Sequence, residues 1–244
     1  MKLKVFHMYP DLLNLYGDRG NIIILERRAR WRGVEVEILD FTKDKEEDLS
    51  EADIIFLGGG SDREQELIYS HLYRFKKLIK DLIEDNVAFL AVCGGYQLLG
   101  DYYLDAYGNK VEGLSILNFY TKAEKGRLIG NILIEATLPI TPKTIVGFEN
   151  HGGRTYHNYK ALGRVIKGCG NNGKDGFEGI VYKNLIGTYL HGPLLSKNPH
   201  LADFIVELAL KRKYKKEIRL PTLSDREEFL AHEKVKNMIL KGSL

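Results

Sequence analysis

The chain has 244 residues, and 44% of them are apolar, which suits one large α/β domain, with two small domains as the alternative. Its 36 lysines and arginines nearly balance 33 aspartates and glutamates, and the net charge of +3 argues against a nucleic-acid-binding protein, which would carry a concentrated basic face. The two cysteines, the lack of an apolar run after a basic start and the lack of a membrane-span-length apolar stretch predict a soluble, cytoplasmic protein without signal peptide or transmembrane segment.

Short apolar strands alternate with helices in the first part of the chain. A short strand that begins near residue 2 and ends at Pro10 is followed by a helix that begins after Asp18, its N-cap, and ends at Gly33. The strands over 52–57 and 87–92 are continuously apolar, as in parallel sheets buried on both faces. Apolar residues at helical spacing predict one helix between them, from residue 62 to 86. This alternation predicts an α/β fold with a doubly wound, mostly parallel sheet.

The pattern changes over residues 101–185, where short strand-like runs lie among glycine-rich loops. These runs predict a mixed, partly antiparallel sheet, which we expect to extend the main sheet rather than to form a separate domain. An apolar strand before His191 and two further helices complete the chain, the last one capped by Ser224. We therefore expect one domain over residues 1–212, with residues 213–244 as a helical extension packed on it.

Cys93 stands at the end of an apolar strand and is followed at once by Gly94 and Gly95. A nucleophile in a sharp strand-to-helix turn needs small neighbours, and the turn points the next backbone N–H, here that of Gly94, into the site. The N-terminus of the following helix favours thiolate over thiol. Cys93 is therefore the candidate nucleophile, and an inert cysteine buried in a β–α turn is the alternative.

A thiolate also needs a base and a place for the developing negative charge. His191 directly follows an apolar strand, and the carboxyl ends of parallel strands meet at one edge of a sheet, so Cys93 and His191 can be neighbours. Gly59 lies in a three-glycine loop after another buried strand, and we expect its N–H and that of Gly94 to bind an oxyanion. The phosphate-binding pattern G-x-x-x-x-G-K-[ST] occurs nowhere in the sequence.

Three short segments together resemble the class I glutamine amidotransferases, in the branch that includes cobyric acid synthase. They are CGGYQLLG at 93–100, GTYLHG at 187–192 and LGGG at 57–60, and the family's Cys-x-x-x-Gln spacing is present as Cys93 and Gln97. The resemblance implies a flavodoxin-like fold and a glutaminase.

The resemblance also implies roles for single residues. Cys93 would attack the side-chain amide of glutamine, and His191 would protonate the departing ammonia and then activate water. Arg127 matches the arginine expected to hold the substrate, since a bidentate guanidinium suits an α-carboxylate. Gln97 would be a weaker substrate contact, or would only pack in the helix after Cys93.

The sequence departs from the family at one position. Many class I enzymes have a carboxylate two residues after the histidine, where this chain has Pro193. The group that orients the imidazole is therefore open: Glu149 is the internal candidate, and a carboxylate from a partner subunit is the one we favour. Asn150, His151 and Arg154 could bind substrate or border an ammonia exit, or they could belong to a glycine-rich turn stabilised by the asparagine, so we assign them no role. The other histidines show no spacing suited to a metal.

Longer segments resemble those members of the family that serve a MurT-type Mur ligase. These segments are YPDLLNLYGDRGN at 9–21, GFENHGGRT at 147–155 and GTYLHGPLLSKNPHLAD at 187–203. The resemblance implies a heterodimer in which this chain hydrolyses L-glutamine without a cofactor or metal of its own. The ligase would bind ATP and Mg and would amidate the D-glutamate α-carboxylate of lipid II to D-isoglutamine in peptidoglycan synthesis.

Two other functions remain as alternatives. One is an amidotransferase subunit for another acceptor, such as a cobyrinate-type carboxylate. The other is a non-catalytic scaffold subunit with the same fold. If the resemblance to the Mur-ligase-dependent members holds, the protein works in the cytoplasm and, through its complex, at the inner face of the membrane.

Overall fold

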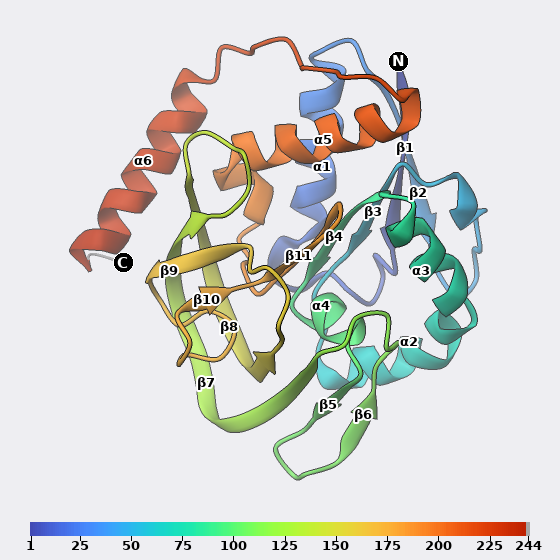
Figure 1. The fold of residues 1–244 in the computed structure, drawn as a ribbon, viewed down its shortest axis with the longest axis vertical. Helices are drawn as coiled ribbons and strands as arrows, with labels where there is room; N and C mark the ends of the chain where they lie inside the picture. Colours follow the sequence, from blue (N-terminus) through green and yellow to red (C-terminus); the bar gives the residue numbers. More distant parts are fainter. Residues whose placement is uncertain (243–244) are drawn as a thin grey trace.

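The apolar runs of the sequence form the centre of a parallel β-sheet (Figure 1). The computed structural model describes residues 1–242, and all structural statements refer to them. This first sheet has the strand order β11-β12-β4-β3-β1-β2, and all its pairs are parallel except β11 with β12. Its strands are β1 (Lys2–Met8), β2 (Glu35–Phe41), β3 (Ile54–Leu57), β4 (Ala88–Val92), β11 (Ile180–Tyr182) and β12 (Leu185–Thr188).

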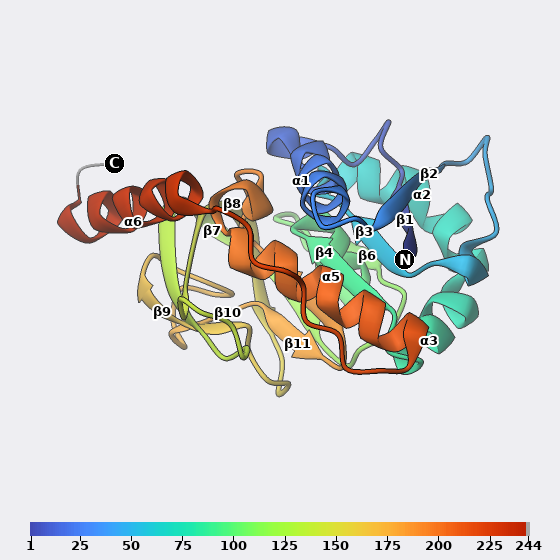
Figure 2. The same ribbon diagram turned by 90° about the horizontal axis from the view of Figure 1, so that it is seen from above.

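Helices cover the first sheet on both faces. As a result, every residue of β3 and β4 is buried. Helices α1 and α5 pack against each other, and α2 packs against α3 and α4 (Figures 1 and 2). The bounds are α1 (Arg19–Arg30), α2 (Asp62–Arg74), α3 (Lys76–Glu84), α4 (Gly94–Leu98) and α5 (Pro199–Tyr214). Short 3-10 helices are η1 (Leu15–Gly17), η2 (Leu49–Glu51) and η3 (Leu194–Lys197). Within the described residues, no helix is long and apolar enough to span a membrane.

The single helix predicted over residues 62–86 is two helices, so this prediction was wrong in detail. The break falls at Phe75, whose backbone leaves the helical region at φ −98° and ψ 3°. The Phe75 ring packs edge-on against Phe41 of β2, with 4.9 Å between ring centroids. Helical spacing of apolar residues continues on both sides of the break, which is why the periodicity did not reveal it.

Most of the antiparallel strands form a second, mixed sheet, whereas we expected them to extend the first. Its order is β10-β9-β7-β5-β6, with β8 paired to β7, and of the antiparallel strands only β11 extends the first sheet. The bounds are β5 (Tyr102–Leu104), β6 (Lys110–Glu112), β7 (Tyr120–Ala136), β8 (Thr144–Tyr156), β9 (Gly163–Lys167) and β10 (Phe177–Glu178). The predicted α/β fold with a mostly parallel sheet is otherwise confirmed.

Backbone hydrogen bonds join the two sheets next to the end of β12. Phe148 of β8 and His191 exchange two of them, from Phe148 N to His191 O at 3.1 Å and from His191 N to Phe148 O at 2.8 Å. Glu178 of β10 adds a second link, since its Oε1 accepts from Thr188 Oγ1 at 2.7 Å and from Tyr189 N at 2.8 Å. The second sheet is therefore fixed at the edge where the strands of the first sheet end.

We expect Glu178 to make stability fall as the pH rises. Burial raises the pKa of this carboxyl from 4.5 to about 8, and its hydrogen bonds with Thr188 and Tyr189 offset only part of this shift. Between these two pH values the folded chain holds a proton that the unfolded chain releases, so the free energy of unfolding decreases with pH. Glu178→Gln keeps the shape and should flatten this decrease in urea unfolding curves at pH 5, 6.5 and 8. An unchanged pH slope would contradict the assignment.

The C-terminal helix α6 (Arg226–Lys241) packs on β7, β8 and η3, so it covers the second sheet (Figure 2). The predicted boundary at residue 212 falls in the last turn of α5, and residues 243–244 of the predicted extension lie outside the described residues. The division into a domain and an extension stays a prediction. The cap of α6 is Asp225, not Ser224, and its carboxylate binds Arg28 of α1 with Oδ1 at 2.9 Å and Oδ2 at 2.6 Å.

Candidate active site

Cys93 occupies a strained turn between β4 and α4, as the sequence predicts. Its φ of 50° and ψ of −106° are unfavourable for a residue with a side chain. The turn packs so closely against the end of β3 and the loop of three glycines that the next two residues must be glycines. A Cβ on Gly95 would lie 2.4 Å from Leu57 O, and one on Gly94 would lie 2.7 Å from Gly60 O. The turn therefore has the form of a nucleophile elbow.

His191 lies beside Cys93, although 98 positions separate them in the sequence. A Cβ added to Gly59 would come within 2.9 Å of His191 Cε1 and 3.4 Å of Cys93 Cβ, so the two side chains converge on this glycine. His191 is fully buried, and within the described part of the chain its Nε2 has no hydrogen-bond partner. The Cys93 thiol is also free of any disulfide.

Asp18 supplies the carboxylate that orients the imidazole. Its Oδ1 lies 3.4 Å from His191 Nδ1, and both side chains are completely buried. Pro193, which stands where many family members have an acid, packs against the N-terminus of α1 instead: a Cβ on Gly20 would lie 2.2 Å from Pro193 Cγ. Asp18, the N-cap residue of α1, thus supplies the carboxylate that position 193 lacks.

The electrostatics of this group favour an imidazolium. Burial lowers the pKa of His191, but the Asp18 carboxylate and the Cys93 side chain more than offset burial and raise this pKa to about 10. At neutral pH the arrangement therefore stabilises a positive charge next to the sulfur. A neighbouring imidazolium favours the thiolate form of a cysteine.

The expectation that Glu149 or a partner carboxylate orients His191 does not agree with this geometry. Glu149 faces the loop after β9, where its carboxylate accepts from Cys169 N at 2.7 Å and Gly170 N at 2.8 Å. The sequence predicts Asp18 as a helix N-cap, and it does precede α1, but its side chain makes no capping hydrogen bond. The only hint in the sequence was an aspartate at the start of the helix that follows the first parallel strand.

The glycine loop also differs from the expectation. Gly59 N donates to Asp18 Oδ2 at 2.8 Å, so this amide is engaged in holding the carboxylate. Gly60 N lies 3.0 Å from the position of a Cβ on Gly94, and Gly60 lines the cavity next to Cys93. Within residues 1–242, neither Gly60 N nor Gly94 N donates a hydrogen bond. The geometry therefore favours the amides of Gly60 and Gly94 as the pair facing a ligand.

A cavity of about 370 Å³ opens in front of Cys93, large enough for a small polar molecule. Arg127, on β7, and Gln97, on α4, both line it, as the sequence predicts. Gln97 is held from both sides: its Oε1 accepts from Gln65 Nε2, and its Nε2 donates to Tyr189 Oη, both at 3.1 Å. No cluster of three or more potential metal ligands exists among the described residues.

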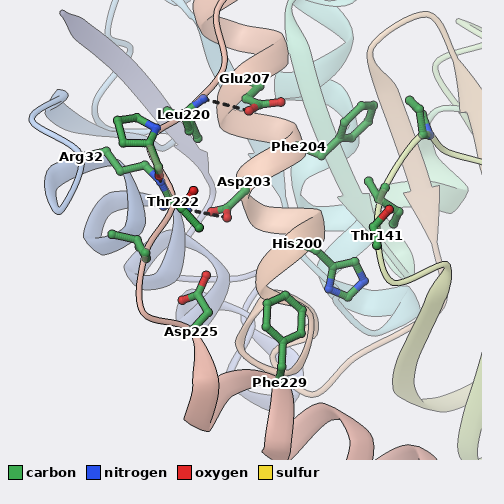
Figure 3. A pocket seen from close by; sticks show the side chains of 14 residues that line it. Arg32, Thr141, His200, Asp203, Phe204, Glu207, Leu220, Thr222, Asp225 and Phe229 are labelled. Atoms are coloured by element: carbon green, nitrogen blue, oxygen red, sulfur yellow. Dashed lines mark hydrogen bonds and ion pairs between the residues drawn. The ribbon is translucent and has the colours of Figure 1, made fainter.

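A second cavity, of about 310 Å³, lies between α5, the β7–β8 turn and the segment that leads to α6 (Figure 3). Its charged groups are already paired: Arg32 Nη2 donates to Asp203 Oδ2 at 2.6 Å, and Glu207 Oε1 accepts from Leu220 N at 2.9 Å. Neither Cys93 nor His191 lines it. We assign these side chains to holding the C-terminal segment on α5.

Comparison with known proteins finds a matching family and two similar chains. The model of the CobB/CobQ-like glutamine amidotransferase domain matches residues 4–199. The chain is 50% identical to the lipid II isoglutaminyl synthase (glutamine-hydrolyzing) subunit GatD of Staphylococcus aureus, over 87% of this chain and 86% of that protein. It is 42% identical to the subunit of the same name from Streptococcus pneumoniae, over 92% of this chain and 86% of that protein.

Solved structures show the same fold at low sequence identity. A crystal structure of a glutamine amidotransferase has a TM-score of 0.58 and 16% identity, over 84% of this chain and 98% of that one. The glutaminase domain of Trypanosoma brucei CTPS with bound acivicin has a TM-score of 0.53 and 12% identity, over 90% and 96% of the two chains.

Proposed function

The chain belongs to the CobB/CobQ-like glutamine amidotransferases, and on this premise we propose that Cys93, His191 and Asp18 hydrolyse L-glutamine to supply ammonia to a partner ligase. The protein is a glutamine-hydrolysing enzyme subunit. The observation that carries the assignment of residues is the meeting of a cysteine elbow and a buried histidine–aspartate pair at one sheet edge. Such a triad is recognised by geometry rather than by sequence order.

The first half of the reaction forms a thioester. The Cys93 thiolate attacks the side-chain amide carbon of glutamine, and the negative charge that develops on the oxygen faces the amides of Gly94 and Gly60. His191, protonated and held by Asp18, gives its proton to the amide nitrogen as the carbon–nitrogen bond breaks. The products of this half are ammonia and a γ-glutamyl thioester on Cys93.

The second half releases glutamate. His191, now neutral, takes a proton from water as the water oxygen attacks the thioester carbon. The carbon–sulfur bond then breaks, the thiolate of Cys93 is restored and the imidazolium is regenerated. Arg127 would hold the α-carboxylate of the substrate throughout, because its guanidinium can donate two parallel hydrogen bonds.

The names of two similar proteins support a proposal for the acceptor and the partner. Making an amide from a carboxylate requires activation of the carboxylate, which glutamine hydrolysis does not provide. The two GatD relatives match this chain over nearly its whole length and carry the name of a lipid II isoglutaminyl synthase subunit. We propose that a MurT-type ligase binds ATP and Mg and uses the ammonia to amidate the D-glutamate α-carboxylate of lipid II in peptidoglycan synthesis.

Co-expression with a MurT-type ligase tests this proposal. The complex should convert lipid II to its amidated form when glutamine and ATP are present, as measured by mass spectrometry. The complex carrying Cys93→Ala should fail with glutamine but work with ammonium chloride, because only the ammonia supply is removed. Hydrolysis of glutamine without amidation of lipid II, together with amidation of a cobyrinate-type acceptor by a cobyrinate ligase, would instead favour the alternative acceptor.

A further inference from the structure

Resting on the proposed glutaminase function, we propose that Asn150 is a positioning residue that makes the site selective for the α-carboxylate of glutamine, acting through Arg127. Arg127 Nε donates to Asn150 Oδ1 at 2.7 Å, and Arg127 Nη2 donates to Asn150 O at 2.7 Å. One residue thus occupies the whole Nε edge of the guanidinium with two parallel hydrogen bonds. Both residues line the cavity that contains Cys93.

The remaining edge of the guanidinium is left for a ligand. A guanidinium has five N–H donors in a rigid plane, and the two used by Asn150 leave those at the Nη1 end. Nη1 lies 3.7 Å from the position of a Cβ on Gly152, which also lines the cavity. Within residues 1–242, Nη1 donates to no acceptor. The Nη1–Nη2 edge can therefore take both oxygens of a carboxylate.

Arg127 needs this support because the sheet does not fix it. The pairing of β7 with β8 shifts between Ala123 and Leu128, so Arg127 lies in a bulge outside the ladder, next to Gly126 at φ 81°. Its side chain is exposed, and a free arginine side chain can adopt many rotamers. Asn150 is in register with Ile129 and so stands on the regular part of β8. It can hold the mobile side chain in one position before substrate arrives.

The amide of Asn150 is itself fixed by a residue that touches the histidine. Its Nδ2 donates to Tyr16 Oη, and the Tyr16 ring lies against the His191 ring with 4.8 Å between centroids. Tyr16 adopts the left-handed conformation, with φ 54° and ψ 26°, and follows Leu15, which lines the cavity. An amide serves both neighbours at once, with its oxygen toward Arg127 and its nitrogen toward Tyr16. Aspartate has the same shape but would neutralise the guanidinium.

Substrate selectivity tests the proposal. Ammonia release by the full chain is measured with L-glutamine and with L-glutaminamide, in which an uncharged amide replaces the α-carboxylate. Asn150→Ala should raise KM for L-glutamine about tenfold with kcat within about threefold, and should leave kcat/KM for L-glutaminamide within about twofold. Asn150→Asp should raise KM for L-glutamine at least as much. Asn158→Ala, whose residue does not line this cavity, is the matched control.

A double variant separates positioning from a merely structural role. If Asn150 acts through Arg127, then Arg127→Ala combined with Asn150→Ala should lose no more than Arg127→Ala alone. Additive losses, or equal losses for both substrates in a variant with an unchanged melting temperature, would overturn the proposal while the glutaminase function stands. A wild-type chain and complex that release no ammonia from glutamine would overturn the proposed function, and this inference with it.

Discussion

Cys93→Ala is expected to abolish glutamine hydrolysis, lowering kcat by about ten-thousand-fold or more. The reaction proceeds through a thioester on the sulfur, and no other group in the cavity can replace a thiolate held beside an imidazolium. The measurement is ammonia release at saturating glutamine, with circular dichroism to confirm folding. Binding of substrate should survive, because Arg127 and the rest of the cavity wall are untouched.

Cys169→Ala is the matched control for this prediction, because it removes the other thiol of the chain. Cys169 is partly buried, and burial together with the nearby Glu149 carboxylate raises the pKa of its thiol, so it is not a reactive thiolate at neutral pH. Its replacement should leave kcat within about twofold. Activity of Cys93→Ala close to that of wild type would instead favour a non-catalytic scaffold with the same fold.

Asp18→Asn is expected to lower kcat by roughly a hundredfold to ten-thousandfold with a smaller change in KM. The substitution keeps the shape but removes the charge that holds His191 Nδ1 and stabilises the imidazolium. Since Asp18 raises the pKa of His191, its loss should lower this pKa. The fraction of imidazolium in the alkaline range then falls, and the alkaline limb of the pH–rate profile should move to lower pH.

The pH dependence of Cys93 alkylation by iodoacetamide measures the same effect without turnover. Glu149→Gln is the control, because that carboxylate binds the loop after β9 and not the histidine. Both variants should be assayed as the isolated chain and in the ligase complex. An Asp18→Asn chain with nearly normal kcat and an unshifted profile would show that the orienting carboxylate comes from elsewhere, for example from a partner subunit.

The sequence predicted the parts of the fold that depend on local pattern. Continuous apolar runs identified β3 and β4, and the glycines after Cys93 identified the elbow, because both reflect what a buried strand and a tight turn require of their own residues. The break at Phe75 was missed since the helical period continues through it. The separate second sheet was missed because the strand pattern shows which segments are strands but not which strands pair.

The site was predictable only where a residue type has few competing explanations. A cysteine before Gly-Gly and a histidine at a strand end together predicted a catalytic pair. In the structure the two side chains lie next to the same glycine, Gly59. Asp18 had a sufficient local explanation as a helix cap, and it is 173 positions from His191, so nothing in the sequence linked the two. The choice between Gly59 and Gly60 depends on which amide donates to Asp18, and this depends on the three-dimensional fold.

The backbone conformation of Cys93 has a consequence for how the enzyme can fail. A residue held at φ 50° and ψ −106° stores about 1–3 kcal/mol of strain, and only its surroundings prevent it from relaxing. Three contacts restrain it: Cys93 N to Thr188 O at 2.8 Å, Gln97 N to Cys93 O at 2.9 Å and Gly95 N to Gly58 O at 3.1 Å. Substitutions that weaken these contacts should let the Cys93 backbone relax to an unstrained conformation while the rest of the molecule stays folded. Heat or mutation would then abolish activity before the protein unfolds.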